Sequence, residues 1–163
     1  MPMIFIDGDL TKFTGAELVC HQCNATSNRS FGLSSQMFKA YPYANIYSGK
    51  LKVVDRSPGI IIARDSPGKQ TIVNMIAQVN PGKPGPKAKN DYDSYEARVE
   101  YFGQCLDAID TQFPNVKTIA MPYGIGCGLA GGDWKLYANL INMWCSIRRP
   151  ELTVYIVKYN EQK

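Results

Sequence analysis

Five glycines within nine positions make one segment of the sequence a candidate anion-binding loop. The segment runs from Met121 to Trp134, and its glycines are Gly124, Gly126, Gly128, Gly131 and Gly132. Glycine allows a backbone to approach a ligand closely and to turn successive N–H groups toward an anion. A merely flexible loop is the alternative, although ordering so many glycines carries a large entropic cost. The spacing matches neither a nucleoside triphosphate loop nor a dinucleotide redox fingerprint, so we expect a phosphate cradle of another kind.

A second segment has the same layout, in which a strand ends and a helix follows. Residues 21–24 (His-Gln-Cys-Asn) end a predicted strand, and residues 30–35 (Ser-Phe-Gly-Leu-Ser-Ser) lead into a predicted helix. The N–H groups at the start of a helix favour an anion. Two such turns after different strands predict a pyrophosphate held between them.

The five cysteines offer a possible metal or redox site, which the pattern disfavours. They are Cys20, Cys23, Cys105, Cys127 and Cys145, an odd number in a chain large enough for a full core. Cys20 and Cys23 are three apart on a predicted strand and would point to opposite faces of a sheet. We expect reduced thiols, no metal site and no cofactor.

Strands alternating with helices must position these segments. Apolar β-branched runs predict the strands, and helical spacing of apolar residues predicts the helices. The expected strands are 3–7, 17–24, 59–64, 71–77, 118–121 and 152–157, and the expected helices are 34–41, 93–113 and one from 134 onward. In such a mixed sheet covered by helices, the ligand site lies outside the carboxyl ends of the strands.

Two of these helices carry finer expectations about their start and their buried face. Ser34 and Ser35 are expected to cap the first helix, and Asp133 the last. The apolar face of the last helix is predicted to consist of Leu136, Leu140, Ile141 and Trp144.

Length and composition indicate one globular domain over residues 1–163. The chain is 45% hydrophobic and 20% charged, with no long block of one charge. Its start does not have the basic, apolar pattern of a signal peptide, and no apolar run is long enough to span a bilayer. We expect a soluble intracellular monomer, cytoplasmic or nuclear, with no membrane partner.

The net charge of +4 favours an anionic partner but does not argue for nucleic acid by itself. Basic residues cluster once, at Lys83, Lys87 and Lys89 in a Pro/Gly-rich run typical of a surface loop. A lid over an anionic ligand is a second interpretation of this run.

Three motifs in order resemble the macro-domain family over nearly the whole chain. They are Gly8-Asp9-Leu10, an asparagine (Asn24) that ends the second strand, and the Pro-x-x-Ile-Gly-Cys-Gly-Leu loop at 122–129. The resemblance is closest to the branch of terminal ADP-ribose protein glycohydrolase and yeast ADP-ribose 1''-phosphate phosphatase. It implies a three-layer α-β-α macro domain, with a central mixed sheet flanked by helices, that holds ADP-ribose.

The resemblance also implies where ADP-ribose would bind. Asp9 would accept a hydrogen bond from the adenine amine beside the Leu10 backbone, and Asn24 would bind the distal ribose. A turn-forming aspartate and a strand-ending Asx turn are the respective alternatives. The two phosphate turns and the adenine contact would come from Phe31, Gly32, Leu33 and Ser34, from Gly124, Ile125, Gly126, Cys127, Gly128 and Leu129, and from Tyr159 or Tyr155.

Departures from the family pattern bear on catalysis. Ser30 and Phe31 precede Gly32 where the family often has glycines, which would narrow the distal ribose pocket. Tyr123-Gly124 adds one position to the second loop. The catalytic aspartate of the hydrolase matches Ala130, and its lysine falls opposite Ala77 or Gln78, so that chemistry is expected to be absent.

His21 and Asn24 are the remaining catalytic candidates. His21 would be the natural general acid or base near the distal ribose, and a structural, hydrogen-bonded histidine is the alternative. Asn24 would hold a water polarised by the ligand's own phosphate. Asp133 is the nearest carboxylate to the second loop, but it is already the expected cap of a helix.

The expected function is binding of ADP-ribose and hydrolysis of a bond at its distal ribose. The bond would belong to ADP-ribose 1''-phosphate, to O-acetyl-ADP-ribose, or to an ADP-ribosyl group on a protein or nucleic acid. A non-catalytic ADP-ribose-binding module is the alternative. RNA or poly-ADP-ribose binding through the Lys83 to Lys89 loop is a third hypothesis.

Overall fold

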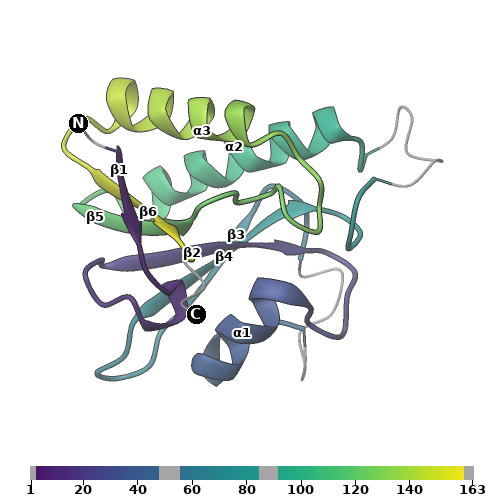
Figure 1. Cartoon of the computed structure of the whole chain (residues 1–163), viewed down its shortest axis with the longest axis horizontal. Helices are drawn as coiled ribbons and strands as arrows, with labels where there is room; N and C mark the ends of the chain where they lie inside the picture. The colour runs from purple at the N-terminus through teal and green to yellow at the C-terminus, as the bar shows by residue number, and fades with distance from the viewer. Residues whose placement is uncertain (1–2, 48–55, 85–91, 160–163) are drawn as a thin grey trace.

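The computed structural model describes residues 3–47, 56–84 and 92–159, and within them six strands form one mixed sheet (Figure 1). The strands are β1 (Met3–Asp7), β2 (Leu18–Asn24), β3 (Ile61–Arg64), β4 (Thr71–Gln78), β5 (Thr118–Pro122) and β6 (Thr153–Lys158). Their order across the sheet is β1-β6-β5-β2-β4-β3. Neighbouring strands are parallel except in the β3–β4 hairpin. The carboxyl ends of β1, β6, β5, β2 and β4 therefore meet at one edge.

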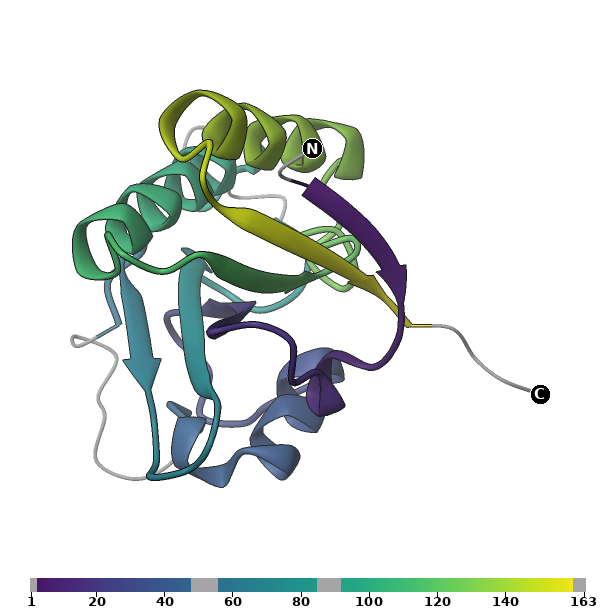
Figure 2. The same ribbon diagram turned by 90° about the vertical axis from the view of Figure 1, so that its left-hand side faces the viewer.

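Helices cover both faces of the sheet (Figure 2). On one face lies α1 (Gly32–Ala40), with the 3-10 turns η1 (Leu10–Lys12) and η2 (Pro42–Ala44) beside it. On the other lie α2 (Tyr95–Gln112) and α3 (Trp134–Met143), which continues as the π-helical turn η4 (Trp144–Arg148). The predicted three-layer α-β-α fold is confirmed.

Alternation along the strands divides the interior into two cores. Phe102 of α2 and Ile141 of α3 pack on one face of the sheet, and Met37 and Phe38 of α1 pack on the other. All five cysteines are free thiols, and Cys20 and Cys23 belong to opposite cores, as predicted. Among the described residues no group of three His, Cys, Asp or Glu side chains could hold a metal ion.

The start of α1 differs from the prediction that serines cap it. The helix begins at Gly32, and its N-cap, Phe31, makes no side-chain hydrogen bond. Gly32 has φ of 58°, a conformation that glycine adopts at little cost, so the chain turns into the helix two residues early. Ser34 and Ser35 consequently lie in the first turn and do not precede it.

The buried face of α3 also differs from the prediction by one position. Asp133 does cap this helix, accepting from the Lys135 N–H at 3.1 Å. Leu136 is 42% exposed, whereas Tyr137 is 2% exposed. Tyr137 takes the place of Leu136, whereas Ile141 and Trp144 are buried and Leu140 packs against the same core, as predicted.

Within the described residues, no helix combines the length and the apolar character that crossing a bilayer requires.

Candidate functional site

A pocket of about 490 Å³ opens at the carboxyl edge of the sheet. It lies between the segment that joins β2 to α1 and the glycine-rich loop that follows β5. The predicted residues that line it are Asn24, Phe31, Leu33 and Ser34 from the first segment and residues 124–129 from the second. The structure therefore brings together the two segments that the sequence singled out.

Several lining residues were not among the predicted binding residues, although the resemblance aligned Ala130, and Ala77 or Gln78, with catalytic positions of the hydrolase. Gln78, Pro81 and Gly82 follow β4, which neighbours β2 in the sheet, and Tyr47 approaches from the α1 side. The rule that ligand sites lie beyond carboxyl strand ends could have found Gln78. The other unpredicted lining residues are Gln22, Cys23, Arg29, Pro122, Tyr123 and Ala130.

The glycine-rich loop leaves several backbone N–H groups without an acceptor. Three turns shape it, in which Ile125 N–H donates to Pro122 C=O at 3.1 Å, Cys127 N–H to Gly124 C=O at 2.8 Å and Gly131 N–H to Gly128 C=O at 3.1 Å. The N–H groups of five lining residues donate to no described residue, and these residues are Gly124, Gly126, Gly128, Leu129 and Ala130. Unpaired N–H groups beside a pocket are suited to an anionic ligand.

The glycines of this loop have two different roles. Gly126 has φ of 78°, and a Cβ there would lie 2.7 Å from Tyr137 Cε2. A Cβ on Gly132 would lie 2.6 Å from the Gly126 carbonyl oxygen. Gly128 has no positive φ, and a Cβ placed on it would meet no atom within 4 Å, so its open side faces space beside the pocket.

The start of α1 supplies the second set of unpaired N–H groups. No side chain caps this helix, so its first N–H groups have no partner within the described chain. Leu33 and Ser34, in that first turn, line the pocket. Gly32 does not line it, but a Cβ on Gly32 would lie 3.0 Å from Leu129 Cδ1, which shows how closely the two segments approach.

The charge that lines the pocket is positive. Among the described lining residues, Arg29 carries the one charged side chain, and no carboxylate is present. Arg29 lies with its guanidinium carbon 5.7 Å from the centre of the Phe31 ring. Burial, with the nearby Asp133 charge, raises the pKa of Cys127 to about 11, so this lining residue is a neutral thiol.

Asn24 forms the strand-ending Asx turn and also presents a free amide donor to the pocket, so the two interpretations of this residue are compatible. Its Oδ1 atom accepts from Thr26 N–H at 3.1 Å and from Ser27 N–H at 2.8 Å, which is an Asx turn. Its Nδ2 amide donates to no described residue, so it offers the pocket a donor. The Asn24 N–H donates to Tyr47 Oη at 2.8 Å, and burial raises the Tyr47 pKa, so this phenol keeps its proton.

His21 lies in the core and does not line the pocket, which corrects its prediction as a catalytic acid or base. It is fully buried against the Phe38 ring, with 5.3 Å between ring centres. Its Nε2 lies 2.6 Å from Asn74 Oδ1. Because Asn74 Nδ2 donates to the Ala44 and Ile62 carbonyls, Oδ1 is the acceptor and His21 carries its proton on Nε2.

His21 does not reach the pocket because it lies too far along β2 from the carboxyl edge of the sheet. His21 and Cys23 do share one face of β2, as predicted, with about 3.8 Å between Cys23 Sγ and His21 Nε2. Cys23 reaches the pocket because it is two residues closer to the carboxyl edge. Burial lowers the pKa of His21 to about 4, so the imidazole is neutral at physiological pH.

The residues predicted to hold adenine lie at the same edge but outside the pocket. Asp9 follows β1 and accepts through Oδ1 from Thr11 N–H at 2.9 Å and from Thr11 Oγ1 at 2.6 Å. Leu10 is buried, and Tyr159 is 64% exposed. Tyr155 packs against Phe13.

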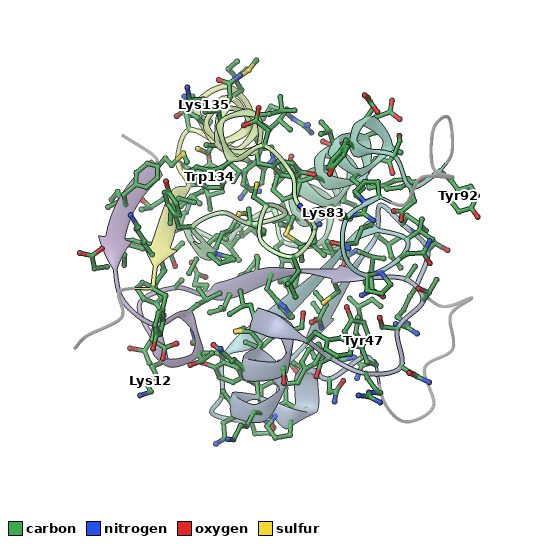
Figure 3. All side chains as sticks on the ribbon, turned by 45° about the vertical axis from the view of Figure 1, so that its right-hand side comes forward. Lys12, Tyr47, Lys83, Tyr92, Trp134 and Lys135 are labelled. Atoms are coloured by element: carbon green, nitrogen blue, oxygen red, sulfur yellow. The ribbon has the colours of Figure 1, made fainter. Side chains whose placement is uncertain are left out.

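The basic run is described only at its start. Lys83, labelled in Figure 3, lays its aliphatic stem against the glycine-rich loop, since a Cβ on Gly131 would lie 2.8 Å from Lys83 Cγ. Lys87 and Lys89 lie outside the described residues.

No protein-family model and no curated protein matches this sequence. Solved structures do match the fold. The macrodomain of Mycobacterium tuberculosis DarG is 18% identical, with a TM-score of 0.70 and 98% of each chain covered. That of Thermus aquaticus DarG is 20% identical, with a TM-score of 0.68 and the same coverage. A mutant macrodomain of Oceanobacillus iheyensis, solved with ADPR, is 14% identical, with a TM-score of 0.58, 96% of this chain and 84% of that chain.

At these identities the likeness shows the fold. The chain has the macrodomain fold, as the resemblance in its sequence implied, and the branch of the family stays a prediction.

The buried histidine predicts a defined loss of stability in acid. The unfolded chain takes up a proton at His21 below about pH 6.5, whereas the folded chain does so only near pH 4. The free energy of unfolding therefore falls as the pH drops through this window, by roughly 3 kcal/mol. His21→Gln keeps a donor for Asn74 and does not titrate, so urea unfolding at a series of pH values should show a shallower decline for this variant.

The chain has one histidine, so its imidazole signals in an NMR titration are unambiguous. Titration near pH 6.5 in the folded protein would contradict the assignment of His21 as a buried neutral residue.

Proposed function

We propose that this chain, with its macrodomain fold, binds ADP-ribose or a close derivative and holds the pyrophosphate between the two loops. One observation carries the proposal: unpaired backbone N–H groups from two separate segments line one pocket that contains no described carboxylate. A pyrophosphate presents acceptor oxygens on both sides, so it can bind both segments at once. The pocket volume lies within the range of small-molecule sites.

The two ends of the ligand have candidate partners at the same edge of the sheet. The free Nδ2 donor of Asn24 would bind a distal ribose hydroxyl, and the second carboxylate oxygen of Asp9 would accept from the adenine amine. β6 and β5 lie between the strands that carry these residues. Three strand spacings of about 4.8 Å separate them, a span that two sugars joined by a pyrophosphate can cover.

The structure supports ligand binding better than it supports catalysis, because the described lining residues lack the side chains that catalysis would need. The resemblance places a catalytic aspartate at Ala130, which lines the pocket, and a catalytic lysine at the buried Ala77 or at Gln78, which also lines the pocket, so neither catalytic side chain is present at these positions. His21 is buried away from the pocket. The described lining residues thus provide donors and one cation, but no carboxylate to act as a general base.

A second candidate function is hydrolysis of ADP-ribose 1''-phosphate, and Arg29 is the observation that favours it. A phosphate on the distal ribose would add negative charge near Asn24, where this guanidinium lines the pocket. Arginine is well suited to such a group because its donors match phosphate oxygens in pairs. Removal of an ADP-ribosyl group from a protein or nucleic acid would use the same end of the pocket.

Gly128 gives the sharpest test of the phosphate cradle. Gly128→Glu should fold as the wild type does, because the site has room for a Cβ and no positive φ. It should nevertheless abolish ADP-ribose binding, since it places a carboxylate beside the proposed pyrophosphate. Calorimetry with ADP-ribose, together with thermal melting, measures both effects.

Gly128→Ala is the matched control, and it should retain binding within a fewfold. Normal affinity in Gly128→Glu would remove the glycine-rich loop from the proposed site. Absence of binding by the wild type at millimolar ADP-ribose would refute the proposed function itself.

Asp9→Asn tests the adenine contact without removing the turn. The asparagine oxygen can still accept from Thr11 N–H, but its amide replaces the free carboxylate oxygen with a donor. Two donors would then face each other at the adenine amine, so affinity for ADP-ribose should fall by about 1 to 3 kcal/mol. Ribose 5-phosphate, which lacks adenine, should bind the variant and the wild type alike. Equal affinities for ADP-ribose would show that Asp9 serves the turn alone.

Arg29→Gln tests the preference for a terminal phosphate. The wild type should bind ADP-ribose 1''-phosphate more tightly than ADP-ribose, and the variant should lose about tenfold of that preference, as expected for a charge-assisted hydrogen bond. Calorimetry measures the ratio, and inorganic phosphate release measures hydrolysis. Retention of the full preference in Arg29→Gln would exclude this residue as its source.

A further inference from the structure

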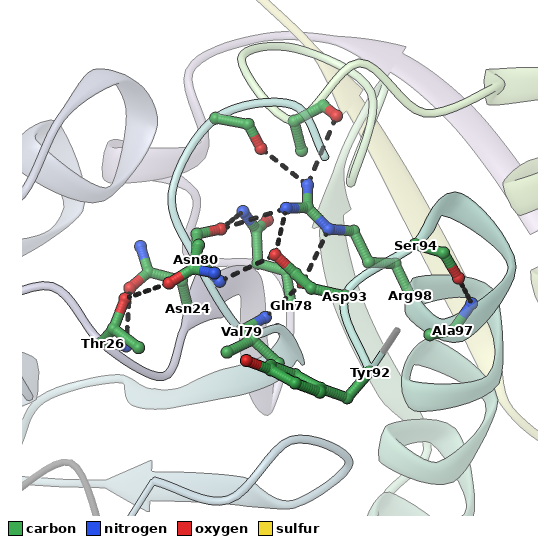
Figure 4. Close-up of polar contacts among 12 residues, drawn as sticks. Asn24, Thr26, Gln78, Val79, Asn80, Tyr92, Asp93, Ser94, Ala97 and Arg98 are labelled. Atoms are coloured by element: carbon green, nitrogen blue, oxygen red, sulfur yellow. Dashed lines mark hydrogen bonds and ion pairs between the residues drawn. The ribbon is translucent and has the colours of Figure 1, made fainter. Parts of the chain in front are cut away.

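Arg98 and Asp93 form a buried ion pair (Figure 4), and neither residue lines the pocket. Arg98 of α2 contacts Asp93, two residues before the helix, through two bonds: Nη2 to Oδ2 at 2.8 Å and Nε to Oδ1 at 3.0 Å. Their side chains are 2% and 5% exposed. Ion pairs at such depth are costly to desolvate, so stability alone explains their presence poorly.

Asp93 holds the chain where it leaves β4. Its carboxylate accepts from Val79 N–H at 2.7 Å and from Asn80 N–H at 3.1 Å. These backbone groups have passed the end of the strand and have no sheet partner of their own. Asp93 therefore fixes the start of the segment that places Pro81 and Gly82 in the pocket wall.

Arg98 joins this segment to the glycine-rich loop. It donates to the Asn80 carbonyl at 3.2 Å, to the Gly82 carbonyl at 2.6 Å and, at the limit of a hydrogen bond, to the Ala130 carbonyl at 3.5 Å. Gly82 and Ala130 both line the pocket. Among the described residues, no backbone hydrogen bond links residues 79–84 to residues 122–132, so Arg98 supplies the polar link between them.

The same network reaches the turn that presents Asn24. Thr26 donates through Oγ1 to Asn80 Oδ1 at 3.1 Å, and Thr26 N–H donates to Asn24 Oδ1. Gln78 Nε2 donates to the Asn80 carbonyl at 2.8 Å, the same oxygen that Arg98 holds. Asn80 thus connects the ion pair to Gln78 and, through Thr26, to Asn24, and both of these residues line the pocket (Figure 4).

We propose that Asp93 and Arg98 are positioning residues, which assemble the pocket walls before the ligand arrives. The inference rests on the proposed function, because the walls in question are those of the ADP-ribose pocket. A pre-formed site avoids the entropic cost of ordering two loops during binding. Loss of the pair should therefore weaken ligand binding even though neither side chain touches the ligand.

Arg149 provides a matched control within the same chain. It is also a buried arginine with two ion pairs, to Asp110 at 2.9 Å and to Glu151 at 2.8 Å. It also donates to loop carbonyls, those of Pro114 and Val116, but just before β5, at the opposite edge of the sheet. Its replacement removes comparable interactions far from the pocket.

The experiment compares Arg98→Met with Arg149→Met. Both variants should melt at lower temperature than the wild type. The Kd for ADP-ribose is measured at a temperature where each variant is fully folded. It should rise about tenfold or more in Arg98→Met, which is the effect usually seen when a residue that orients a ligand-binding group is lost. In Arg149→Met it should stay within about twofold of the wild-type value. Arg98→Lys, which keeps the charge but not the two-pronged geometry, should lie between the wild type and Arg98→Met.

Amide hydrogen exchange tests the same inference without ligand. The bonded N–H groups of Val79, Asn80, Gly131 and Gly132 should lose protection together in Arg98→Met and keep it in Arg149→Met. If Arg98→Met does not fold, Arg98→Lys carries both measurements. Equal loss of affinity in the two arginine variants, or unchanged exchange at these four amides, would overturn the positioning role. If the wild type does not bind ADP-ribose, the proposed function fails while the exchange data still decide whether the pair holds the loops.

Discussion

Backbone N–H and C=O groups lose their sheet partners where β1, β6, β5, β2 and β4 end, and these strands all end at one edge. Each chain segment that leaves this edge must find other partners for its polar groups. After β1 the Asp9 carboxylate supplies them, after β2 the Asn24 amide, and after β4 the Asp93 carboxylate with Arg98. After β5 the glycine-rich loop closes three turns, and five of its pocket-lining N–H groups donate to no described residue. The pocket is the part of this edge where a ligand can accept hydrogen bonds from backbone N–H groups that have no acceptor in the described protein.

The same requirement determines the charge of the pocket. Three carboxylates near this edge accept backbone N–H groups: Asp9 and Asp133 at the starts of helical turns, and Asp93, which also pairs with Arg98. These anions are neutralised or turned toward N–H groups, while Arg29 lines the pocket without an ion-pair partner among the described residues. The site is consequently built to receive negative charge. None of these three carboxylates lines the pocket.

Much of this architecture was accessible from the sequence, because strand and helix periodicity is a local property. The strands were predicted to within a few residues, and Asp133 was correctly predicted as a helix cap. The two chosen loops do line one pocket, and their role in binding stays a prediction. The wall formed by Gln78, Pro81 and Gly82 was missed because it depends on β4 lying next to β2, and no local pattern encodes strand order. His21 was placed on the correct face of β2 but at the wrong depth, since alternation gives the face and not the distance to the edge. The early start of α1 depends on the positive φ of Gly32, which composition alone does not reveal.

The open environment of Gly128 has a consequence for how such a protein can diverge. In the same loop, Gly126 and Gly132 are fixed by contacts with Tyr137 and with the loop's own backbone, so changes there reduce the stability of the fold. Position 128 has no such contacts, so a mutation there changes the stability of the fold little. Its main effect would be on the binding of a ligand. Under the proposed function, ligand preference can therefore change at this one position during evolution, while the scaffold that carries it remains unchanged.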